Sequence, residues 1–331
     1  MLQAIVVNKT GDQFEAAVRS ISDAELEQQT PGTEVLLQVD YSTINYKDSL
    51  VLTNRGPLVR RWPMVAGIDC AGRVLASSDP QWKAGDRVVL NGWGTSEQHW
   101  GGLAQKARAK ADWLVAVPDK FTNRQAMAIG TAGYTAALSV DALERFGVRP
   151  EQGAVLVTGA SGGVGSIAIA LLSARGFRVA ASTGKLAEAD YLKALGATDI
   201  IDRTELSGAG RPLQTERWSA VVDSVGSHTL ANALAQIKRG GAACACGLAQ
   251  GPDLPATVMP FILRGVGLLG IDSVMASRAK RLRAWQLLSE SLDPGRLEST
   301  VREVALAGAF QVAHDLLAGH IRGRVVVDVN R

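Results

Sequence analysis

The stretch Val155–Gly165 constrains the fold of this chain more than any other part of its sequence. It reads VLVTGASGGVG: four apolar or β-branched residues, a glycine-dense turn, and the start of an aliphatic segment. This pattern predicts a strand buried on both faces, a tight turn, and a helix packed on that strand. Ala160, Gly162 and Gly165 have the spacing of the dinucleotide fingerprint, with alanine at the first glycine position. The stretch therefore predicts dinucleotide binding, and the alternative is a glycine-rich loop that only turns the chain.

Length and composition bound the remaining possibilities. The 331 residues exceed one typical core and predict two domains. A net charge of +3 argues against a dedicated nucleic-acid partner and is compatible with an anionic substrate. Three cysteines give no disulfide framework, which predicts a reducing compartment and a cytoplasmic location. No signal peptide and no membrane-spanning segment is expected, so a membrane partner is not predicted either.

The N-terminal third is predicted to be rich in β-structure. Short apolar or alternating runs are separated by glycine and proline at spacings typical of a small barrel or sandwich. The expected strands are Gln3–Val7, Glu34–Tyr41, Gly67–Leu75 and Asp86–Leu90.

The rest of the chain begins with a helical stretch over Thr122–Arg145 and then alternates between strands and helices. This alternation predicts a parallel doubly wound sheet of about six strands. A last strand over Arg322–Val329 needs a partner, and we expect it in the N-terminal domain. The expected sheet strands are Val155–Thr158, Arg178–Ser182, Asp199–Ile201, Ala220–Asp223, Ala242–Cys246 and Val266–Gly270, and the expected helices are Ala187–Leu195, Thr229–Ile237 and Ser277–Leu292.

This organisation resembles the medium-chain dehydrogenase/reductase superfamily over the whole chain. The resemblance implies an α/β fold: a Rossmann doubly wound parallel sheet plus a β-rich GroES-like catalytic domain. It implies catalytic-domain residues 1–121, a Rossmann NADP-binding domain over residues 122–294, and a return to the catalytic domain over residues 295–331.

The zinc ligands of that superfamily are missing from this sequence. Zinc members carry an early cysteine, a Gly-His-Glu motif and a lobe with four cysteines. Here the early position reads Asn45-Tyr46-Lys47-Asp48, the second reads Gly67-Ile68-Asp69, and residues 91–102 contain no cysteine. Because thiolate and imidazole ligands are absent from these positions, no metal is expected.

Several stretches are most similar to the zinc-free, quinone-oxidoreductase-like branch, and within it to NADPH-dependent acrylyl-CoA reductases. The resemblance implies reduction of the 2,3 double bond of a small enoyl-CoA, acrylyl-CoA giving propanoyl-CoA, by a homodimer. The alternatives are an NADPH:quinone or general enone oxidoreductase, and a non-enzymatic NADPH-binding sensor. The stretches are residues 45–48, 63–69, 91–94, 99–104, 130–136, 257–264 and 272–275.

The end of the second Rossmann strand indicates which dinucleotide binds. An NAD enzyme usually presents a carboxylate to the ribose there, whereas this chain has Ser182-Thr183-Gly184-Lys185. Hydroxyl groups and a lysine suit a 2′-phosphate, and Arg203 is a further candidate; the alternative is that both charges are ordinary surface residues. The resemblance extends the cofactor contacts to Tyr46, Ser161, Gly162, Gly163, Val164, Leu248, Ile262 and Ser273.

The candidate catalytic residues are Tyr46, Asn45, Asp48, Asp69 and Arg324. The resemblance places Tyr46 near the nicotinamide, where its hydroxyl could bind substrate or donate a proton; the alternative is a core tyrosine. Asp69 is flanked by apolar residues and is costly to bury unless paired, with Arg324 as a candidate partner. The alternative for that pair is a structural ion pair that holds the C-terminal strand.

Three other features have simpler interpretations. A single histidine such as His99 is more often structural than catalytic. Cys244 and Cys246 fall on one face of a strand, which favours packing over metal or redox chemistry. Arg55, Arg60 and Arg61 flank the predicted substrate cleft and either meet the phosphates of coenzyme A or form a solvated face.

Overall fold

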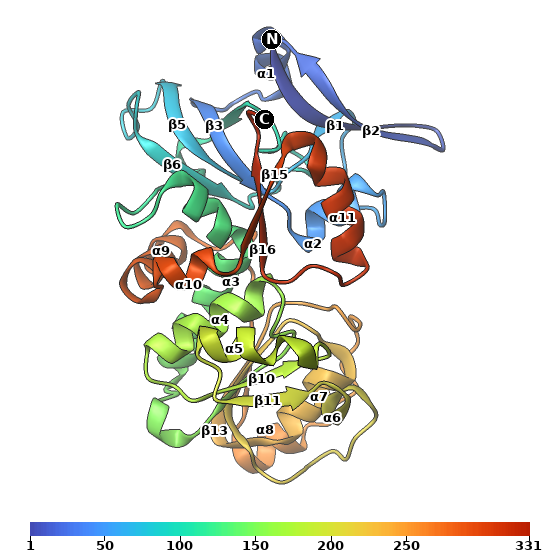
Figure 1. Cartoon of the computed structure of the whole chain (residues 1–331), viewed down its shortest axis with the longest axis vertical. Coiled ribbons are helices and arrows are strands. Elements are labelled where there is room, and N and C mark those ends of the chain that lie inside the picture. The colour runs from blue at the N-terminus through green and yellow to red at the C-terminus, as the bar shows by residue number, and fades with distance from the viewer. The chain divides into compact units, whose positions relative to one another are not determined.

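The structure, a computed structural model, describes residues 1–331, and these divide into two compact units. Unit 1 comprises residues 1–131, 273–282 and 297–331, and unit 2 comprises residues 132–272 and 283–296. Figure 1 shows the elements of both. The sequence-based domain boundaries after residues 121 and 294 stay predictions. No helix is long and apolar enough to cross a membrane.

Unit 1 contains two β-sheets. The smaller sheet has the order β2-β1-β4, and the larger one has the order β15-β16-β3-β5-β6-β8, with β7 pairing to β3. The β-rich character predicted from the sequence is confirmed. The strands are β1 Leu2–Thr10, β2 Gln13–Ile21, β3 Val35–Thr43, β4 Met64–Val65, β5 Asp69–Ser77, β6 Arg87–Asn91, β7 Lys106–Ala109, β8 Leu114–Ala116, β15 Val301–Ala305 and β16 Arg324–Asp328.

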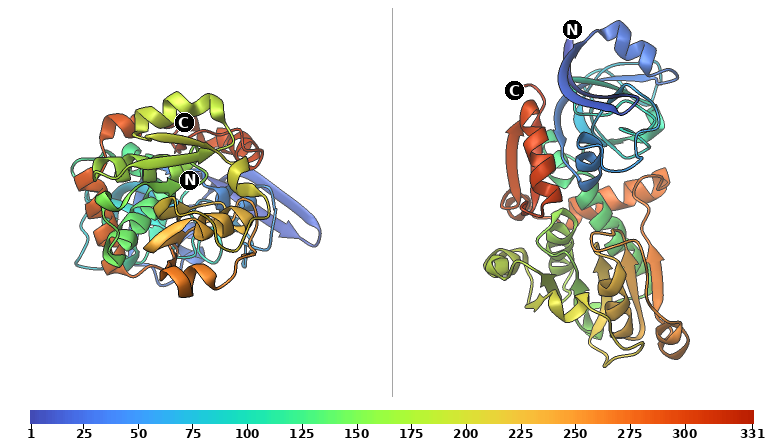
Figure 2. Two further views of the ribbon diagram at one scale, coloured as in Figure 1. Left: turned by 90° about the horizontal axis from the view of Figure 1, so that it is seen from below. Right: turned by 90° about the vertical axis from the view of Figure 1, so that its right-hand side faces the viewer.

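The C-terminal strand β16 lies inside the larger sheet of unit 1. It pairs antiparallel with β3, with Val326 opposite Thr43, and parallel with β15. In Figures 1 and 2 these red elements lie beside the blue N-terminal strands. The predicted return of the C-terminal strand to the N-terminal domain is thereby confirmed. Helix α11, Ala309–Leu317, packs against α2, Tyr46–Leu52.

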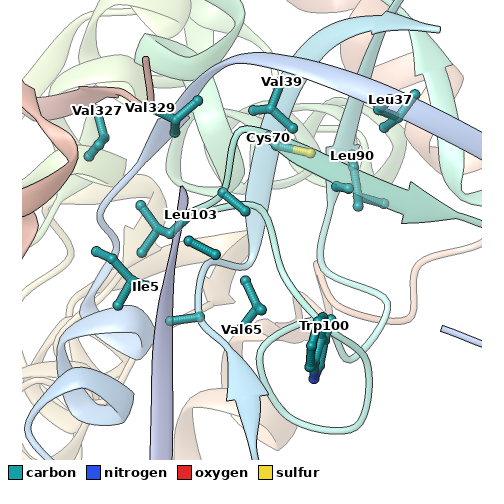
Figure 3. Packing of buried hydrophobic residues seen from close by; sticks show 14 of the residues in the cluster. Ile5, Leu37, Val39, Val65, Cys70, Leu90, Trp100, Leu103, Val327 and Val329 are labelled. Atoms are coloured by element: carbon teal, nitrogen blue, oxygen red, sulfur yellow. The ribbon is translucent and has the colours of Figure 1, made fainter. Parts of the chain in front are cut away.

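The core of unit 1 is built from alternate residues of these strands. In β3, Val35, Leu37 and Val39 are buried, whereas the intervening residues are partly exposed. Figure 3 shows Leu37 and Val39 among core side chains from β1, β4, β5, β6 and the C-terminus. Burial of such a shared apolar face is the main term that favours folding of the unit.

Unit 2 contains a six-stranded parallel sheet with the order β11-β10-β9-β12-β13-β14. The strand order reverses between β9 and β12, which is the topological switch point where such sheets bind ligands. The predicted doubly wound sheet is confirmed. The strands are β9 Val155–Val157, β10 Val179–Thr183, β11 Asp199–Asp202, β12 Trp218–Asp223, β13 Ile237–Ala245 and β14 Gly267–Gly270.

Helices pack against this sheet, and α4 is a largely buried one among them. α4 contacts β9 and β10, and residues 165–172 of the helix are all buried. The helices wholly within unit 2 include α4 Gly163–Ala174, α5 Ala189–Leu195, α6 Thr204–Ser207, α7 Ser227–Ala235 and α8 Met259–Arg264. The other α-helices of the chain, besides α2 and α11, are α1 Asp23–Gln29, α3 Asn123–Phe146, α9 Arg278–Ser291 and α10 Pro294–Glu298.

Candidate functional site

The glycine-dense turn of unit 2 follows β9 and leads directly into α4, as the sequence predicts. Gly159 has a φ of +58°, in the left-handed region that glycine tolerates best. A β-carbon on Gly165 would lie 2.5 Å from the Gly159 carbonyl oxygen and 2.6 Å from Cα of Ala160. The helix therefore approaches the turn more closely than any side chain at position 165 allows. The 12-residue helix begins at Gly163, and its N-terminal N–H groups favour an anion.

The predicted 2′-phosphate residues lie together at the carboxyl ends of β10 and β11. The Ser161 and Thr183 hydroxyl oxygens are 3.3 Å apart, and Thr183 Oγ1 accepts the N–H of Lys185 at 3.0 Å. The Arg203 N–H donates to the Thr183 carbonyl at 3.0 Å. A β-carbon on Gly184 would lie 2.5 Å from Nε of Arg203, so the guanidinium covers this glycine.

This set of groups fits a phosphate monoester on the ribose. It offers hydroxyl groups, a lysine and a guanidinium, which together match a dianionic group with several acceptor oxygens. Strand β11 ends in a carboxylate, Asp202, whose Oδ1 accepts the N–H and the hydroxyl of Thr204, each at 2.8 Å. These hydrogen bonds lower the pKa of Asp202. Its carboxylate is therefore engaged within its own turn.

The other predicted cofactor contacts are scattered. Leu248 follows β13 and is 56% exposed, and Ile262 lies on α8 and is 72% exposed. Ser273 belongs to unit 1, where its carbonyl accepts from Arg281 at 3.3 Å. The assignment of these three residues to the cofactor stays a prediction.

In unit 1, Asp48 is fully buried at the first turn of α2. Its Oδ2 accepts the N–H of Asn45 at 2.9 Å and Nδ2 of Asn45 at 3.1 Å, and its Oδ1 accepts the N–H of Ile68 at 2.9 Å. Asn45 is the N-cap of α2, so Asp48 supplies one half of a capping box. Burial raises the pKa of Asp48 to about 6, with a further contribution from the charge of Asp69.

Asp69, at the start of β5, is also fully buried and accepts four hydrogen bonds. Nδ2 of Asn45 donates at 2.8 Å and Nδ2 of Asn91 at 2.7 Å. Thr131 donates through its N–H at 2.7 Å and its hydroxyl at 2.6 Å. These donors satisfy the carboxylate without water, which is the condition for burying it.

Arg324, the candidate partner of Asp69, forms no direct ion pair with this carboxylate. Its Nε donates to the Ala128 carbonyl at 2.9 Å, and a terminal nitrogen donates to Oγ1 of Thr43 at 2.8 Å. Burial lowers the pKa of Arg324, and the charges of Asp69 and Asp48 oppose that effect. The guanidinium therefore balances the two carboxylates through space while it binds β3 and α3.

Asn45 joins the two buried carboxylates. Its Nδ2 group donates to both Asp48 and Asp69, which leaves its Oδ1 as an acceptor. This oxygen is buried and has no hydrogen-bond partner. Tyr46 follows immediately as the first residue of α2 and is 47% exposed. The alternative of a core tyrosine is therefore wrong, because this side chain reaches solvent.

Two members of this network, Asn91 and Thr131, were not predicted from the sequence. Asn91 ends β6, and Thr131 follows the break in α3 at Gly130. A signal did exist for both, because each lies within or beside a stretch that carries the family resemblance. Their contact with Asp69 spans 22 and 62 residues, however, and no local pattern encodes such a distance.

The remaining polar candidates fit structural roles. The centroids of the His99 and Trp113 rings are 4.8 Å apart, and burial lowers the pKa of His99. The thiols of Cys244 and Cys246 donate to backbone carbonyls, and burial raises the pKa of both. No group of three or more His, Cys, Asp or Glu side chains could hold a metal ion.

Two family profiles match the two units. The profile "Alcohol dehydrogenase GroES-like domain" matches residues 31–119, and the profile "Zinc-binding dehydrogenase" matches residues 163–290. The first range lies in unit 1, and the second contains the fingerprint helix and most of the parallel sheet.

Three bacterial proteins are similar over essentially the whole chain. Acrylyl-CoA reductase AcuI of Ruegeria pomeroyi is 51% identical and covers 100% of both chains. The yhdH oxidoreductase of Salmonella enterica, solved in complex with NADP, is 46% identical with a TM-score of 0.95 over 98% of this chain and 99% of its own.

The third protein, YhfP of Bacillus subtilis, is named as a putative quinone oxidoreductase. It is 44% identical over 99% of this chain and 98% of its own. Its solved structure with NAD bound has a TM-score of 0.93 and covers 99% of each chain. The resemblance inferred from the motifs is confirmed, and the chain belongs to the medium-chain dehydrogenase/reductase superfamily, with an acrylyl-CoA reductase among its full-length relatives.

Proposed function

We propose that this protein is an NADPH-dependent reductase of the 2,3 double bond of a small enoyl-CoA, and that it converts acrylyl-CoA to propanoyl-CoA. The observation that carries the proposal is the 51% identity to AcuI over the full length of both chains. The order of the parallel sheet and the fingerprint turn at its switch point support the dinucleotide part.

NADPH is the proposed cofactor because of the groups at the ends of β10 and β11. Ser161, Thr183, Lys185 and Arg203 would hold the 2′-phosphate, and the N-terminus of α4 would hold the pyrophosphate. When bound, the cofactor supplies the hydride for the β-carbon of the substrate. A relative was solved with NAD bound, so the preference between NADPH and NADH needs its own test. The residues of this chain favour NADPH.

Tyr46 is the proposed catalytic residue of unit 1. Reduction of a conjugated thioester places negative charge on the carbonyl oxygen, and a well-placed hydroxyl donor stabilises that charge. The phenol is exposed on the first turn of α2, whereas Asn45, Asp48 and Asp69 are buried beneath this turn. We propose these three and Arg324 as positioning residues that fix the start of α2.

A substrate panel tests the proposal. The purified protein with NADPH should reduce acrylyl-CoA with a higher kcat/KM than crotonyl-CoA, a quinone or a simple enone. A quinone reduced faster than acrylyl-CoA would instead favour the oxidoreductase named for the Bacillus relative. Binding of NADPH without turnover of any activated alkene would leave a cofactor-binding sensor.

A homodimer formed through β14 is the proposed assembly. This strand is at the edge of the parallel sheet and consists of two glycines and two leucines, with no charge or proline to block pairing. Leu268→Lys should convert the dimer to a monomer in light scattering, and an unchanged mass would exclude this interface. The three free cysteines support a reducing, cytoplasmic location.

A further inference from the structure

Residues 54–62 of unit 1 form a basic segment that the mechanism above does not use. The stretch 49–68 contains three arginines and no aspartate or glutamate. Arg55 and Arg60 are exposed, and neither guanidinium forms an ion pair or a hydrogen bond. Arg61 differs, because its guanidinium donates to the backbone carbonyl and to Oε1 of Gln29, the latter at 2.9 Å.

The backbone that carries these two arginines is held in place. The N–H of Arg55 donates to the Leu50 carbonyl at 2.8 Å, and the N–H of Arg60 donates to the Glu97 carbonyl at 2.9 Å. Leu58, Val59 and Trp62 pack against the core of unit 1. The charged ends are thus unpaired, although the chain between them is anchored.

The segment lies next to Tyr46. Lys47, the residue after Tyr46, forms an ion pair with the carboxylate of Glu97, whose carbonyl accepts from Arg60. This pair neutralises the carboxylate of the residue that binds the Arg60 backbone. Arg55 follows the other end of α2, and the seven residues of that helix span about 10 Å. Two free guanidinium groups therefore lie near the helix that begins with the proposed catalytic tyrosine.

We infer that Arg55 and Arg60 bind the phosphate groups of the coenzyme A part of the substrate. This inference rests on the proposed function and assigns a site for the end of the substrate that does not react. In an acyl-CoA the pantetheine arm separates the thioester from the phosphates, so the two ends require separate contacts. Arginine is the side chain best suited to phosphate oxygens, because its planar fork donates two parallel hydrogen bonds.

The experiment compares two substrates that share the reacting acyl group. Acrylyl-CoA carries the phosphates, and acrylyl-pantetheine lacks them. The double variant Arg55→Ala/Arg60→Ala should raise KM for acrylyl-CoA by about tenfold or more, with kcat unchanged. It should leave both constants for acrylyl-pantetheine unchanged. In the wild type, added salt should raise KM for acrylyl-CoA alone, and the double variant should lose this sensitivity.

Arg73→Ala is the matched control, because Arg73 is an exposed arginine of unit 1 on β5 without an ion pair. This variant should change neither kcat nor KM for either substrate. The inference is overturned if the double variant affects both thioesters equally or affects neither, or if the wild type uses acrylyl-pantetheine as well as acrylyl-CoA. If acrylyl-CoA is not turned over, the proposed function fails, and calorimetric titration with free coenzyme A then tests the phosphate site. Weaker binding of coenzyme A to the double variant than to the wild type supports the site, and equal binding refutes it.

Discussion

A β-carbon placed on Gly130 would lie 2.5 Å from a terminal guanidinium nitrogen of Arg324. Gly130 also has a φ of +49° and interrupts α3, which frees the N–H of Thr131 for Asp69. Gly130→Ala should therefore combine backbone strain with a steric clash and destabilise unit 1 by about 3 kcal/mol or more.

Urea unfolding measures this loss, and Gly85→Ala is its control. Gly85 has a φ of +93°, but a β-carbon at this position would meet nothing within 4 Å, so the variant reports backbone strain alone, about 1–2 kcal/mol. If both variants lose the same free energy of unfolding, the clash of the new β-carbon with Arg324 adds no destabilisation. Fluorescence follows unit 1 well, because five of the seven tryptophans lie there: Trp62, Trp82, Trp93, Trp100 and Trp113.

The buried carboxylate of Asp48 should make stability depend on pH. Its pKa rises from 3.8 to about 6 on folding, so the folded state binds the proton more tightly. Stability should increase as pH falls through about 6 and level off below 3.8, where both states are protonated. One pKa unit corresponds to about 1.36 kcal/mol, so the full effect is about 3 kcal/mol.

Asp48→Asn isolates this contribution from other titrating groups. The variant should be less stable throughout, because Asn45 and Ile68 donate to different oxygens of Asp48, and asparagine keeps only one of these two acceptors. Its unfolding free energy should lack the rise that the wild type shows between neutral pH and pH 4. The same rise in the variant would assign the effect to another group.

Cofactor preference should depend on the charges at the ends of β10 and β11. Lys185→Ala combined with Arg203→Ala should weaken NADPH binding by about a hundredfold, because two charge-assisted contacts to the 2′-phosphate are lost. NADH binding should change little. Fluorescence titration measures both dissociation constants, and equal losses for the two dinucleotides would contradict the assignment.

Tyr46→Phe should lower kcat on the order of a hundredfold with little change in NADPH affinity, because it removes one donor from the developing charge. A solvent isotope effect that shrinks in the variant would identify Tyr46 as the proton donor. A rise in KM for NADPH at constant kcat would indicate cofactor positioning instead. Unchanged kcat and KM would remove Tyr46 from the mechanism.

Activity should not require a metal, although one matching profile is named for zinc. The positions compared with zinc ligands hold Asn45, Ile68 and Asp69, and the two polar side chains among them are engaged by hydrogen bonds within the network. Dialysis against a chelator should leave kcat/KM intact, while a zinc alcohol dehydrogenase treated alongside loses activity. Stoichiometric zinc that is lost together with activity would contradict this expectation.

Local patterns in the sequence were sufficient to predict the parallel sheet. The strand, turn and helix around Gly162 are encoded by neighbouring residues, and hydrophobic runs located each later strand, although β13 begins at Ile237, five residues before its predicted start. The hairpin strand β2, Gln13–Ile21, was missed because its burial pattern is mostly exposed and no apolar run marks it. Helix α2 was missed for a related reason, because its start is marked only by the Asp48 side chain, which accepts the N–H of the N-cap Asn45.

The buried network was only partly predictable. Asn45, Asp48, Asp69 and Arg324 stand out as polar residues in apolar surroundings, and the structure brings them together. The pairing among them is set by partners far away in the chain, such as Thr43 for Arg324, 281 residues apart. Arg324 was only a candidate partner of Asp69, and no direct ion pair forms because Thr131 and two asparagines already donate to the carboxylate.

The position of β16 between β3 and β15 imposes an order on biosynthesis. At about 5–20 residues per second, a ribosome completes β16 roughly 15–60 s after it completes β3. Before β16 is complete, the parallel sheet of unit 2 already has all of its strands, whereas β3 can pair with β5 and β7 but lacks its neighbour β16. Unit 2 can fold while translation continues, and unit 1 closes its sheet only after β16 has emerged, so its open strand edge is the part of the nascent chain that most needs chaperone protection.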